Sequence, residues 1–360
     1  MTELVYAAVT PAFLVNEQLA PGLARDCQGV VIEEGVEGLR TLEAHFIAVG
    51  AGATGPGTRM LYLDGSIDFG KAIKVAVGPD SARRIIFEGT VSALEVIYTE
   101  GEPPLVAVLA EDLMMKLRMT RRMHTYRDVT DGDILANIAG FHGLSPQADV
   151  DGPRYKVVHQ VNQSDLAFLR SRARLVQAEL WCDGQTLHMA SRARRQGTTL
   201  TLVQGNDLLA VRICADLAHQ RSAVRITGYD VSARDAIDES ATADVVDAEI
   251  KSGRTGPRIV ERALGASVSM RVRETAVSTG DANAWAKAEM LRRARRFVTV
   301  TGTTHGTPDM VVGTRLQLQR VGPPFEGDGY YVTRVRHTYD LIRGLRTRFD
   351  AERSTVNEAA

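Results

Sequence analysis

The segment Thr125–Met189 constrains the fold most strongly, because it contains two short helices with clear start signals in a chain that otherwise alternates short strands and turns. The first helix is expected to begin at Thr130 and Asp131, whose side-chain oxygens can accept hydrogen bonds from free backbone N–H groups. Gly143 is expected to end it, since glycine readily adopts the left-handed conformation common at helix C-termini. The apolar face of this helix consists of Ile134, Leu135, Ile138 and Phe141.

The second helix is expected to begin at Ser164 and Asp165. A strand over Tyr155–Val161 precedes it, and a hairpin over Glu179–Met189, with its turn at Asp183–Gly184, follows it. The centre of the chain is therefore predicted to run helix, strand, helix, hairpin. The apolar stripe of the second helix consists of Leu166, Leu169, Ala173 and Val176, with Arg170, Arg172 and Arg174 largely outside it.

These helices carry two motifs. T-x-x-D-V-T-x-x-D-I-L-x-x-I-A begins at Thr125, and Q-x-N-Q-S-D-L-x-F-L-R-x-R-A begins at Gln160. In order and spacing, over roughly Phe87–Met189, the chain resembles the late control D protein family. That family comprises the baseplate-hub proteins of contractile phages and related injection machines, and it is similar to the hub part of VgrG.

The resemblance implies an α+β, strand-dominated fold with two related antiparallel β-barrels of the split-barrel type and with helical and mixed insertions. It implies a structural hub of a phage tail, a tailocin or a phage-like injection system, and not an enzyme. Three copies of such a hub form a ring of pseudo-sixfold symmetry that joins a six-fold inner tube to a three-fold spike. The implied partners are two further copies of the chain, an inner tube or tube-initiator protein, a spike protein and other baseplate components.

The spike is expected to be a separate chain. The sequence reaches Ala360 without the oligonucleotide-fold domain and the long glycine-valine repeat of a β-helix that spike-fused VgrG-type proteins carry.

Short strands separated by Gly, Pro and Asp are expected on both sides of the centre. Those before it are Val30–Glu33, Leu42–Val49, Ala72–Val77, Arg84–Val91, Leu94–Tyr98 and Leu105–Leu109. Those after it are Gly197–Leu202, Leu208–Ile213, Val224–Thr227, Phe297–Thr301, Arg315–Leu318, Tyr330–His337 and Leu345–Ala351.

A faint internal repeat favours two related barrels. Gly70-x-x-Ile73-x-Val75 precedes Val91 and Leu94, and Gly313-x-x-Leu316-x-Leu318 precedes Val332 and Val335. We expect a first barrel over residues 1–112, the central unit over 113–190 and a second barrel over 191–360. The last part includes an acidic segment, Asp230–Arg258, which is expected to be a surface excursion with little core of its own.

A third helix is predicted over Asp281–Arg296. Its apolar face consists of small residues that suit close packing on a sheet, with Ala284, Lys287, Ala288, Leu291 and Ala294 in line. The opposite face carries Arg292, Arg293, Arg295 and Arg296. Such a cluster suggests a nucleic-acid patch.

Two observations count against nucleic acid. No aromatic residues interleave with these arginines for base stacking, and the net charge of the whole chain is −1. An acidic protein neighbour or plain solvent is the better prediction, and Glu at Arg292 and Arg293 is expected to leave folding intact and to weaken assembly. The arginines of Leu113–Met123 are predicted to be solvated on a strand or short helix, in preference to an anion site; they are Arg118, Arg121 and Arg122.

Motifs for chemistry are missing, and no catalytic, metal-binding or cofactor-binding residue is predicted. The eight histidines include no H-x-x-x-H or H-E-x-x-H group, and the chain has no nucleophile elbow or dinucleotide fingerprint. The glycine-rich segment Ala51–Thr58 is expected to be a loop. A phosphate cradle there would need a following helix, but Met60–Leu63 is typical of a strand.

Two weaker catalytic candidates remain. His337 lies on a predicted strand, where Asp340 could orient it as a base, although catalysis would also need a nucleophile. The adjacent acids Asp238 and Glu239 are interpreted as solvated charges of the acidic segment.

The remaining features indicate a chain made in the cytoplasm. Cys27, Cys182 and Cys214 form no C-x-x-C pair and are expected to be reduced and packed. Glu3 and Pro11 are unlike a signal peptide, and no apolar run is long enough for a membrane anchor. We expect the chain to become part of an assembled phage-like particle that leaves the cell on lysis.

Two other classes of protein share this strand-rich composition. One is a split-barrel enzyme that binds flavin or a small ligand at a dimer interface. The other is a monomeric binding module for glycan or peptide.

Overall fold

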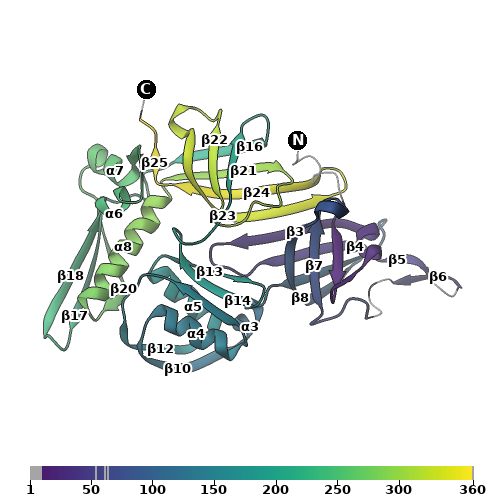
Figure 1. The fold of residues 1–360 in the computed structure, drawn as a ribbon, viewed down its shortest axis with the longest axis horizontal. Coiled ribbons are helices and arrows are strands. Elements are labelled where there is room, and N and C mark those ends of the chain that lie inside the picture. The colour runs from purple at the N-terminus through teal and green to yellow at the C-terminus, as the bar shows by residue number, and fades with distance from the viewer. Residues whose placement is uncertain (1–9, 53–54, 61, 63–64, 359–360) are drawn as a thin grey trace.

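The computed structural model describes residues 10–52, 55–60, 62 and 65–358. It is a strand-dominated α+β fold, in which one 13-stranded sheet combines strands from residues 12–111 with strands from residues 199–353 (Figure 1). Most of the smaller sheets and the longer helices lie in residues 114–191 and 223–295. The fold class predicted from the sequence is confirmed.

The first third forms a six-stranded section of the large sheet, here called the first module, in the order β3-β4-β9-β8-β7-β1 with every pair antiparallel. Its strands are β1 (Ala12–Val15), β3 (Cys27–Gly35), β4 (Thr41–Ile47), β7 (Ala72–Val77), β8 (Arg84–Ile97) and β9 (Leu105–Glu111). Alternate side chains point inward and pack around Phe13, Phe46 and Phe87. The short strand β2 (Gln18–Leu19) pairs with β1, and α2 (Pro21–Asp26) follows it.

The glycine-rich segment was predicted to be a loop, and this prediction is wrong for the described residues. Val49–Gly52 and Gly55–Met60 are strands β5 and β6, which pair antiparallel and extend away from the first module (Figure 1). Residues 53–54, and all of Met60–Leu63 except Met60 and Tyr62, lie outside the described residues. The predicted strands Arg84–Val91 and Leu94–Tyr98 are one strand, β8, with a bulge between Val91 and Ala93.

Strands from residues 199–215 and 298–353 form a second six-stranded section, the second module. Its strands are β15 (Thr199–Val203), β16 (Leu208–Ala215), β21 (Val298–His305), β22 (Arg315–Gln319), β23 (Gly327–Asp340) and β24 (Gly344–Arg353). β15 and β22 pair parallel, which departs from the antiparallel expectation, and the other pairs are antiparallel. The module has its own core around Tyr330, Val332 and Phe349, and β23 pairs with β3 to join the two modules.

The faint sequence repeat corresponds to a repeated structure. In the first module, Gly70 donates its N–H to the carbonyl of Val91, and Val91 donates to Lys71. In the second, Gly313 donates to Val332, and Val332 donates to Thr314. Each glycine has a positive φ, +78° and +96°, which explains the residue type.

The elements around these glycines also repeat. A short strand, a single 3-10 turn and a strand of 14 residues follow in each module: β7, η1 (Asp80–Ala82) and β8, then β22, η2 (Pro323–Phe325) and β23. Both long strands have a bulge directly after the repeated valine. The two modules are therefore related in detail, as two related barrels would be.

The central unit lies beside the junction of the two modules (Figure 1). Its elements are α3 (Met114–Met119), β10 (Arg121–Val129), α4 (Asp131–Phe141), β11 (Ser145–Asp149), β12 (Tyr155–Ser164), α5 (Asp165–Leu175), β13 (Ala178–Asp183) and β14 (Thr186–Ser191). Both predicted helices are confirmed. Thr130 caps α4 through the N–H of Asp133, Ser164 caps α5 through the N–H of Ala167, and Gly143 has a φ of +68°.

Details of the central unit differ from the sequence prediction. The polar segment after α4 is not a gap: it is strand β11, which pairs parallel with β14. The hairpin turn is Gly184–Gln185, one residue later than predicted, because Asp183 still pairs with Thr186. Asp131 does not cap α4. Its carboxylate is buried and accepts a hydrogen bond from Arg172, whose side chain is buried together with it.

One carboxylate connects four elements of this unit. Asp165, at the start of α5, is fully buried and accepts hydrogen bonds from Arg122 on β10, His142 after α4 and Gln160 on β12. The distances between the bonded atoms are 2.9, 2.7 and 2.8 Å.

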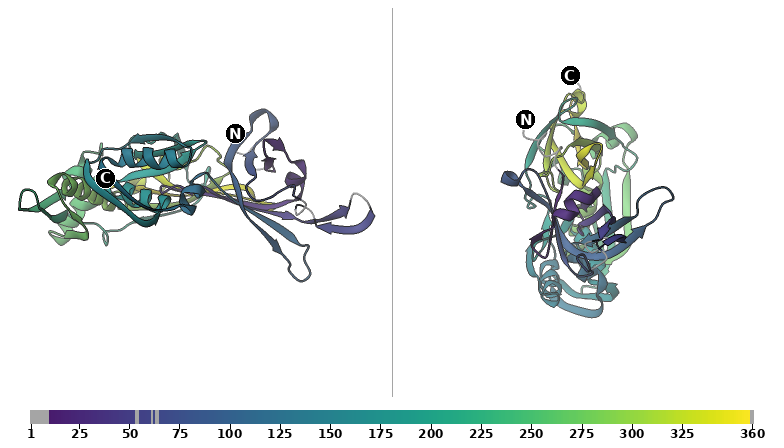
Figure 2. Two further views of the ribbon diagram at one scale, coloured as in Figure 1. Left: turned by 90° about the horizontal axis from the view of Figure 1, so that it is seen from below. Right: turned by 90° about the vertical axis from the view of Figure 1, so that its right-hand side faces the viewer.

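A further lobe lies at the opposite end of the molecule from the first module (Figures 1 and 2). It contains β17 (Ala223–Asp230), β18 (Asp235–Thr242), α6 (Asp244–Asp247), α7 (Gly256–Leu264), β20 (Val268–Ala276) and α8 (Thr279–Arg295), and β19 (Arg254–Thr255) pairs there with β25 (Thr355–Val356). The strand order is β18-β17-β20.

The prediction that Asp230–Arg258 has little core of its own is wrong. Ile237 and Ala241 of β18, together with Val246 of α6, are buried in the same core cluster as Trp285 of α8. The long helix α8 packs on β17 and β18, and it covers apolar residues that are too few and too small to be recognised as a core from the segment alone.

Candidate functional site: an arginine-lined groove

The residues first considered for chemistry do not form a catalytic site. His337 is buried, and its Nδ1 lies 3.0 Å from Oγ1 of Thr347. The Asp340 carboxylate instead accepts the backbone N–H groups of Ile342 and Arg343 in the turn after β23. The hypothesis that Asp340 orients His337 as a base is therefore wrong. Burial, aided by the charge of Arg40, lowers the pKa of His337 to about 4.

The two acidic residues considered for catalysis, Asp238 and Glu239, bind side chains of the same chain. Asp238 forms an ion pair with Arg225 across the β17–β18 hairpin, and Glu239 accepts a hydrogen bond from Asn283 at 3.3 Å. Within the described ranges, no three His, Cys, Asp or Glu side chains lie together as metal ligands. Cys27 and Cys182 are buried and free as predicted, whereas Cys214 is free but exposed.

The arginines of Leu113–Met123 are bound to neighbours in the same chain. Arg118 pairs with Glu111 at 2.7 Å, Arg122 with Asp165 at 2.9 Å, and Arg121 donates to the side chain of Asn162 at 3.2 Å. They lie on α3 and β10, in agreement with the predicted short helix or strand, but the prediction that they are solvated is wrong for Arg122, which is 27% exposed and pairs with a buried carboxylate.

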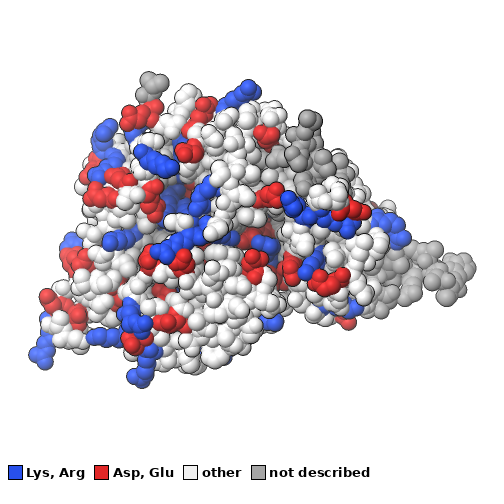
Figure 3. Space-filling view, in the orientation of Figure 1, with Lys and Arg blue, Asp and Glu red and all other residues white. Residues whose placement is uncertain are grey.

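A groove of about 1210 Å³ lies between α8, the central unit and the second module. Figure 3 shows Lys and Arg side chains gathered around the middle of this face. Nine arginines and five carboxylates line the groove, and two of the arginines, Arg295 and Arg334, pair with Glu249 and Glu33 outside the lining. The charged residues of the lining are Arg170, Arg174, Arg192, Arg271, Arg292, Arg293, Arg295, Arg296 and Arg334, with Glu37, Glu179, Glu289, Asp350 and Glu352.

The positive excess is concentrated at the end of α8. Glu289 is nearly buried and faces three guanidinium groups: Arg292 and Arg293 at 2.7 Å each, and Arg271 at 3.6 Å. Burial would raise the pKa of Glu289, but the hydrogen bonds and charges of Arg292 and Arg293 lower it below its ordinary value. Arg292 and Arg293 thus bind the same carboxylate, whose single negative charge balances only one of these two positive charges.

Two further arginines have no carboxylate bound to them within the described part of the chain. Arg296 is exposed, and its guanidinium has no hydrogen-bond or ion-pair partner there. Among the described residues, Arg170 donates to backbone carbonyls alone, those of Glu37 at 2.9 Å and Gly38 at 3.0 Å. Burial lowers the pKa of Arg170, which is expected for a partly desolvated cation that lacks a bonded anion.

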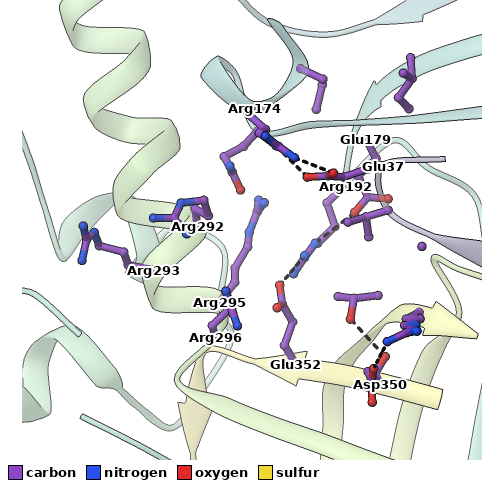
Figure 4. Close-up of a pocket in the computed structure, with 18 of the residues that line it drawn as sticks. Glu37, Arg174, Glu179, Arg192, Arg292, Arg293, Arg295, Arg296, Asp350 and Glu352 are labelled. Carbon is purple, nitrogen blue, oxygen red and sulfur yellow. Dashed lines mark hydrogen bonds and ion pairs between the residues drawn. The ribbon is translucent and has the colours of Figure 1, made fainter. Parts of the chain in front are cut away.

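Other side chains of the groove are paired across its walls (Figure 4). Arg174 of α5 binds Glu37 with two hydrogen bonds of 2.7 Å, and Arg192 binds Glu352 of β24 at 2.5 Å. Arg295 binds Glu249, which lies after α6, at 2.6 Å. These pairs hold the surrounding elements in position.

A buried ionic network lies beneath the groove. Arg195 contacts Glu34 of β3 at 2.8 Å and Glu179 of β13 at 3.2 Å, and Glu34 also binds Arg40 at 2.6 Å. Burial opposes ionisation of Glu34, but the charges of Arg40 and Arg195 lower its pKa below the ordinary value. The network joins β13 of the central unit to β3 of the large sheet, so it holds these two strands together beside the groove.

The sequence predicted part of this surface. It singled out the four arginines at the end of the third helix, and all four line the groove. It missed Arg170, Arg174 and Arg192, because nothing in their local pattern signals that α5 and the turn after β14 lie beside α8.

Comparison with solved structures defines the class of fold. A 43 kDa tail protein of prophage MuSo2 from Shewanella oneidensis has a TM-score of 0.67 at 15% identity, over 96% of this chain and 98% of that one. A tail protein from Neisseria meningitidis has a TM-score of 0.66 at 12% identity, over 96% of both chains. A component of the E. coli type VI secretion system, itself similar to the T4 bacteriophage tail proteins gp27 and gp5, has a TM-score of 0.56 at 13% identity over 93% and 76%.

The chain thus has the fold shared by phage tail proteins and type VI secretion components, which is the fold that the resemblance to the late control D family implies. A family model described as the Alg8 N-terminal domain matches residues 64–340, and the chain belongs to that family. No curated protein matches the chain. None of the helices in the described part of the chain combines the length and apolar character that a membrane span requires.

Proposed function

We propose that this chain is the baseplate hub of a contractile injection machine, a structural and non-enzymatic adaptor. Three copies would form a ring that joins the six-fold inner tube on one face to a separate three-fold spike on the other. The fold common to phage tail and type VI secretion proteins supports a role in a tail-like particle.

The internal repeat is the observation that carries this proposal. Each chain presents two modules with the same glycine, valine and bulge arrangement and with separate cores. Three chains with two modules each give six near-equivalent positions, so a trimer can match a hexameric ring of subunits in the tube. Closed rotational symmetry also satisfies the interacting surfaces without open-ended growth.

In this proposal the two modules, over about residues 1–112 and 191–360, contact the tube, and the central unit over 113–190 is inserted between them. The chain would be made in the cytoplasm, would join the particle together with tube, spike and other baseplate proteins, and would be released with it.

Mass photometry of the chain, alone and co-expressed with candidate tube and spike proteins, tests the proposal. A trimer of the 39.2 kDa chain has a mass of about 118 kDa, and that mass, or a heavier complex containing three copies, is expected. A species with one copy or two copies under both conditions would refute the hub. A dimer containing a bound chromophore would favour a split-barrel enzyme instead.

A further inference from the structure

We propose that the arginine-lined groove binds an extended acidic segment of a partner protein, with its carboxylates on the guanidinium groups of Arg170, Arg292 and Arg296. The inference depends on the proposed function only for the source of this segment, which would be another component of the same particle.

The charges of the groove call for an anionic ligand. Arg292 and Arg293 share the one carboxylate of Glu289. Within the described part of the chain, Arg296 is unpaired and Arg170 is held by carbonyl oxygens alone. The C-terminus of α8 offsets part of this charge, since helix C-termini carry a partial negative charge. Its effect is about half an elementary charge, which is smaller than the excess.

A protein ligand fits these groups better than a small anion. The groove of about 1210 Å³ exceeds the roughly 300–1,000 Å³ of typical small-molecule pockets. Planar guanidinium groups bind carboxylates with two parallel hydrogen bonds, so Asp and Glu side chains suit arginines that are spread along a groove.

The same surface disfavours nucleic acid. No Phe, Tyr or Trp is among the described residues that line the groove, so these offer bases no aromatic side chain on which to stack. Glu37 and Asp350 are also in the lining and are nearly half exposed, at 45% and 41%. A peptide can place backbone N–H donors against these carboxylates, whereas a phosphodiester backbone has no donors and would be repelled.

Fluorescence anisotropy with a labelled peptide of alternating Glu and Gly, at low ionic strength, tests the inference on the full chain. Arg296→Glu is the main variant, because Arg296 is exposed and its side chain forms no hydrogen bond or ion pair with other described residues. The matched control is Arg262→Glu, an exposed arginine in the last turn of α7 that does not line the groove.

We expect Arg296→Glu to weaken peptide binding by about threefold to tenfold, since reversing an exposed charge replaces an attraction with a repulsion. Arg262→Glu, with the same change in net charge, should stay within about twofold of the unchanged chain. Equal losses in the two variants, or no binding by the unchanged chain, would overturn the inference.

Single-stranded oligothymidine of equal charge is the second probe. We expect the chain to bind the oligonucleotide more weakly than the peptide. If it bound the oligonucleotide more tightly, and Arg296→Glu abolished that binding, the groove would be a nucleic-acid site and the proposal of a protein partner would be wrong. The mass of the same preparations separates the two proposals: a trimer that binds no acidic peptide contradicts only the groove, whereas a monomer that binds it contradicts only the hub.

Discussion

Asp165→Ala should be the most informative destabilising change in the central unit. The Asp165 carboxylate is fully buried and accepts hydrogen bonds from Arg122, His142 and Gln160, so it connects β10, β12 and the two helices. Alanine would leave the Arg122 guanidinium without its partner in a site where that side chain is only 27% exposed.

The expected cost follows from these contacts. Breaking a buried ion pair by removing one partner typically costs about 3–5 kcal/mol, because the other charge stays buried. The loss of the Gln160 bond would add about 1 kcal/mol, and relaxation of Arg122 toward solvent would recover part of the total. We therefore expect a loss of about 4 kcal/mol in the free energy of unfolding.

Urea denaturation followed by tryptophan fluorescence measures this loss. Trp181 lies on β13 of the central unit and Trp285 in the core that packs against it, and they are the only two tryptophans of the chain. The control is Asp149→Ala, whose ion pair with Arg194 is about half exposed and should contribute less than about 1 kcal/mol. If both variants lost the same small amount, the buried Asp165 cluster would not exist as described.

Three further predictions concern packing, pH and the groove. Leu169→Asp places a charge at a fully buried position on α5 and should cost at least about 4 kcal/mol; a soluble, fully folded variant would show that the helix is not docked. For His337, with a pKa of about 4 in the folded chain and an ordinary value of about 6.5, the unfolded chain binds a proton between these pH values that the folded chain does not. Stability should therefore fall as the pH is lowered from about 6.5 to 4, by up to about 3 kcal/mol, and His337→Gln should reduce this slope; equal slopes of urea midpoint against pH in the two proteins would contradict the assignment. Replacing both Arg292 and Arg293 with Glu should cost about 2–4 kcal/mol in a urea titration, because the nearly buried Glu289 would lose two partners and face two like charges. A double variant as stable as Arg296→Glu would show that Glu289 does not depend on them.

This last prediction replaces the expectation from sequence that the double change leaves folding intact. From sequence, Arg292 and Arg293 were assigned to the exposed face of the helix, and their bonds to Glu289 at i−3 and i−4 were not considered. Arg296 has no such bond, which makes it the better probe of the surface.

The sequence correctly predicted features that depend on interactions between residues close together in the chain. The caps at Thr130 and Ser164 and the positive φ of Gly143 each depend on residues within a few positions, and all were predicted correctly. The repeat at Gly70 and Gly313 was visible in sequence for the same reason, since a positive φ restricts the residue type.

Features that depend on distant segments were missed. The acidic segment gained a core only because α8, some forty residues later, packs on β18. The strands β5 and β6 were not recognised because they are rich in glycine. Glycine is as typical of loops as it is of strands whose side chains do not pack. The groove brings together residues from Glu37 to Glu352, and its charge excess exists only once the chain is folded.

The decisive experiment for the trimeric hub is cryo-electron microscopy of the assembled particle, with copies of this chain counted around its axis. Three copies are expected, with their two modules alternating to form six similar densities against the tube. Six copies that each contribute one module to the ring, or a single copy on the axis, would contradict it.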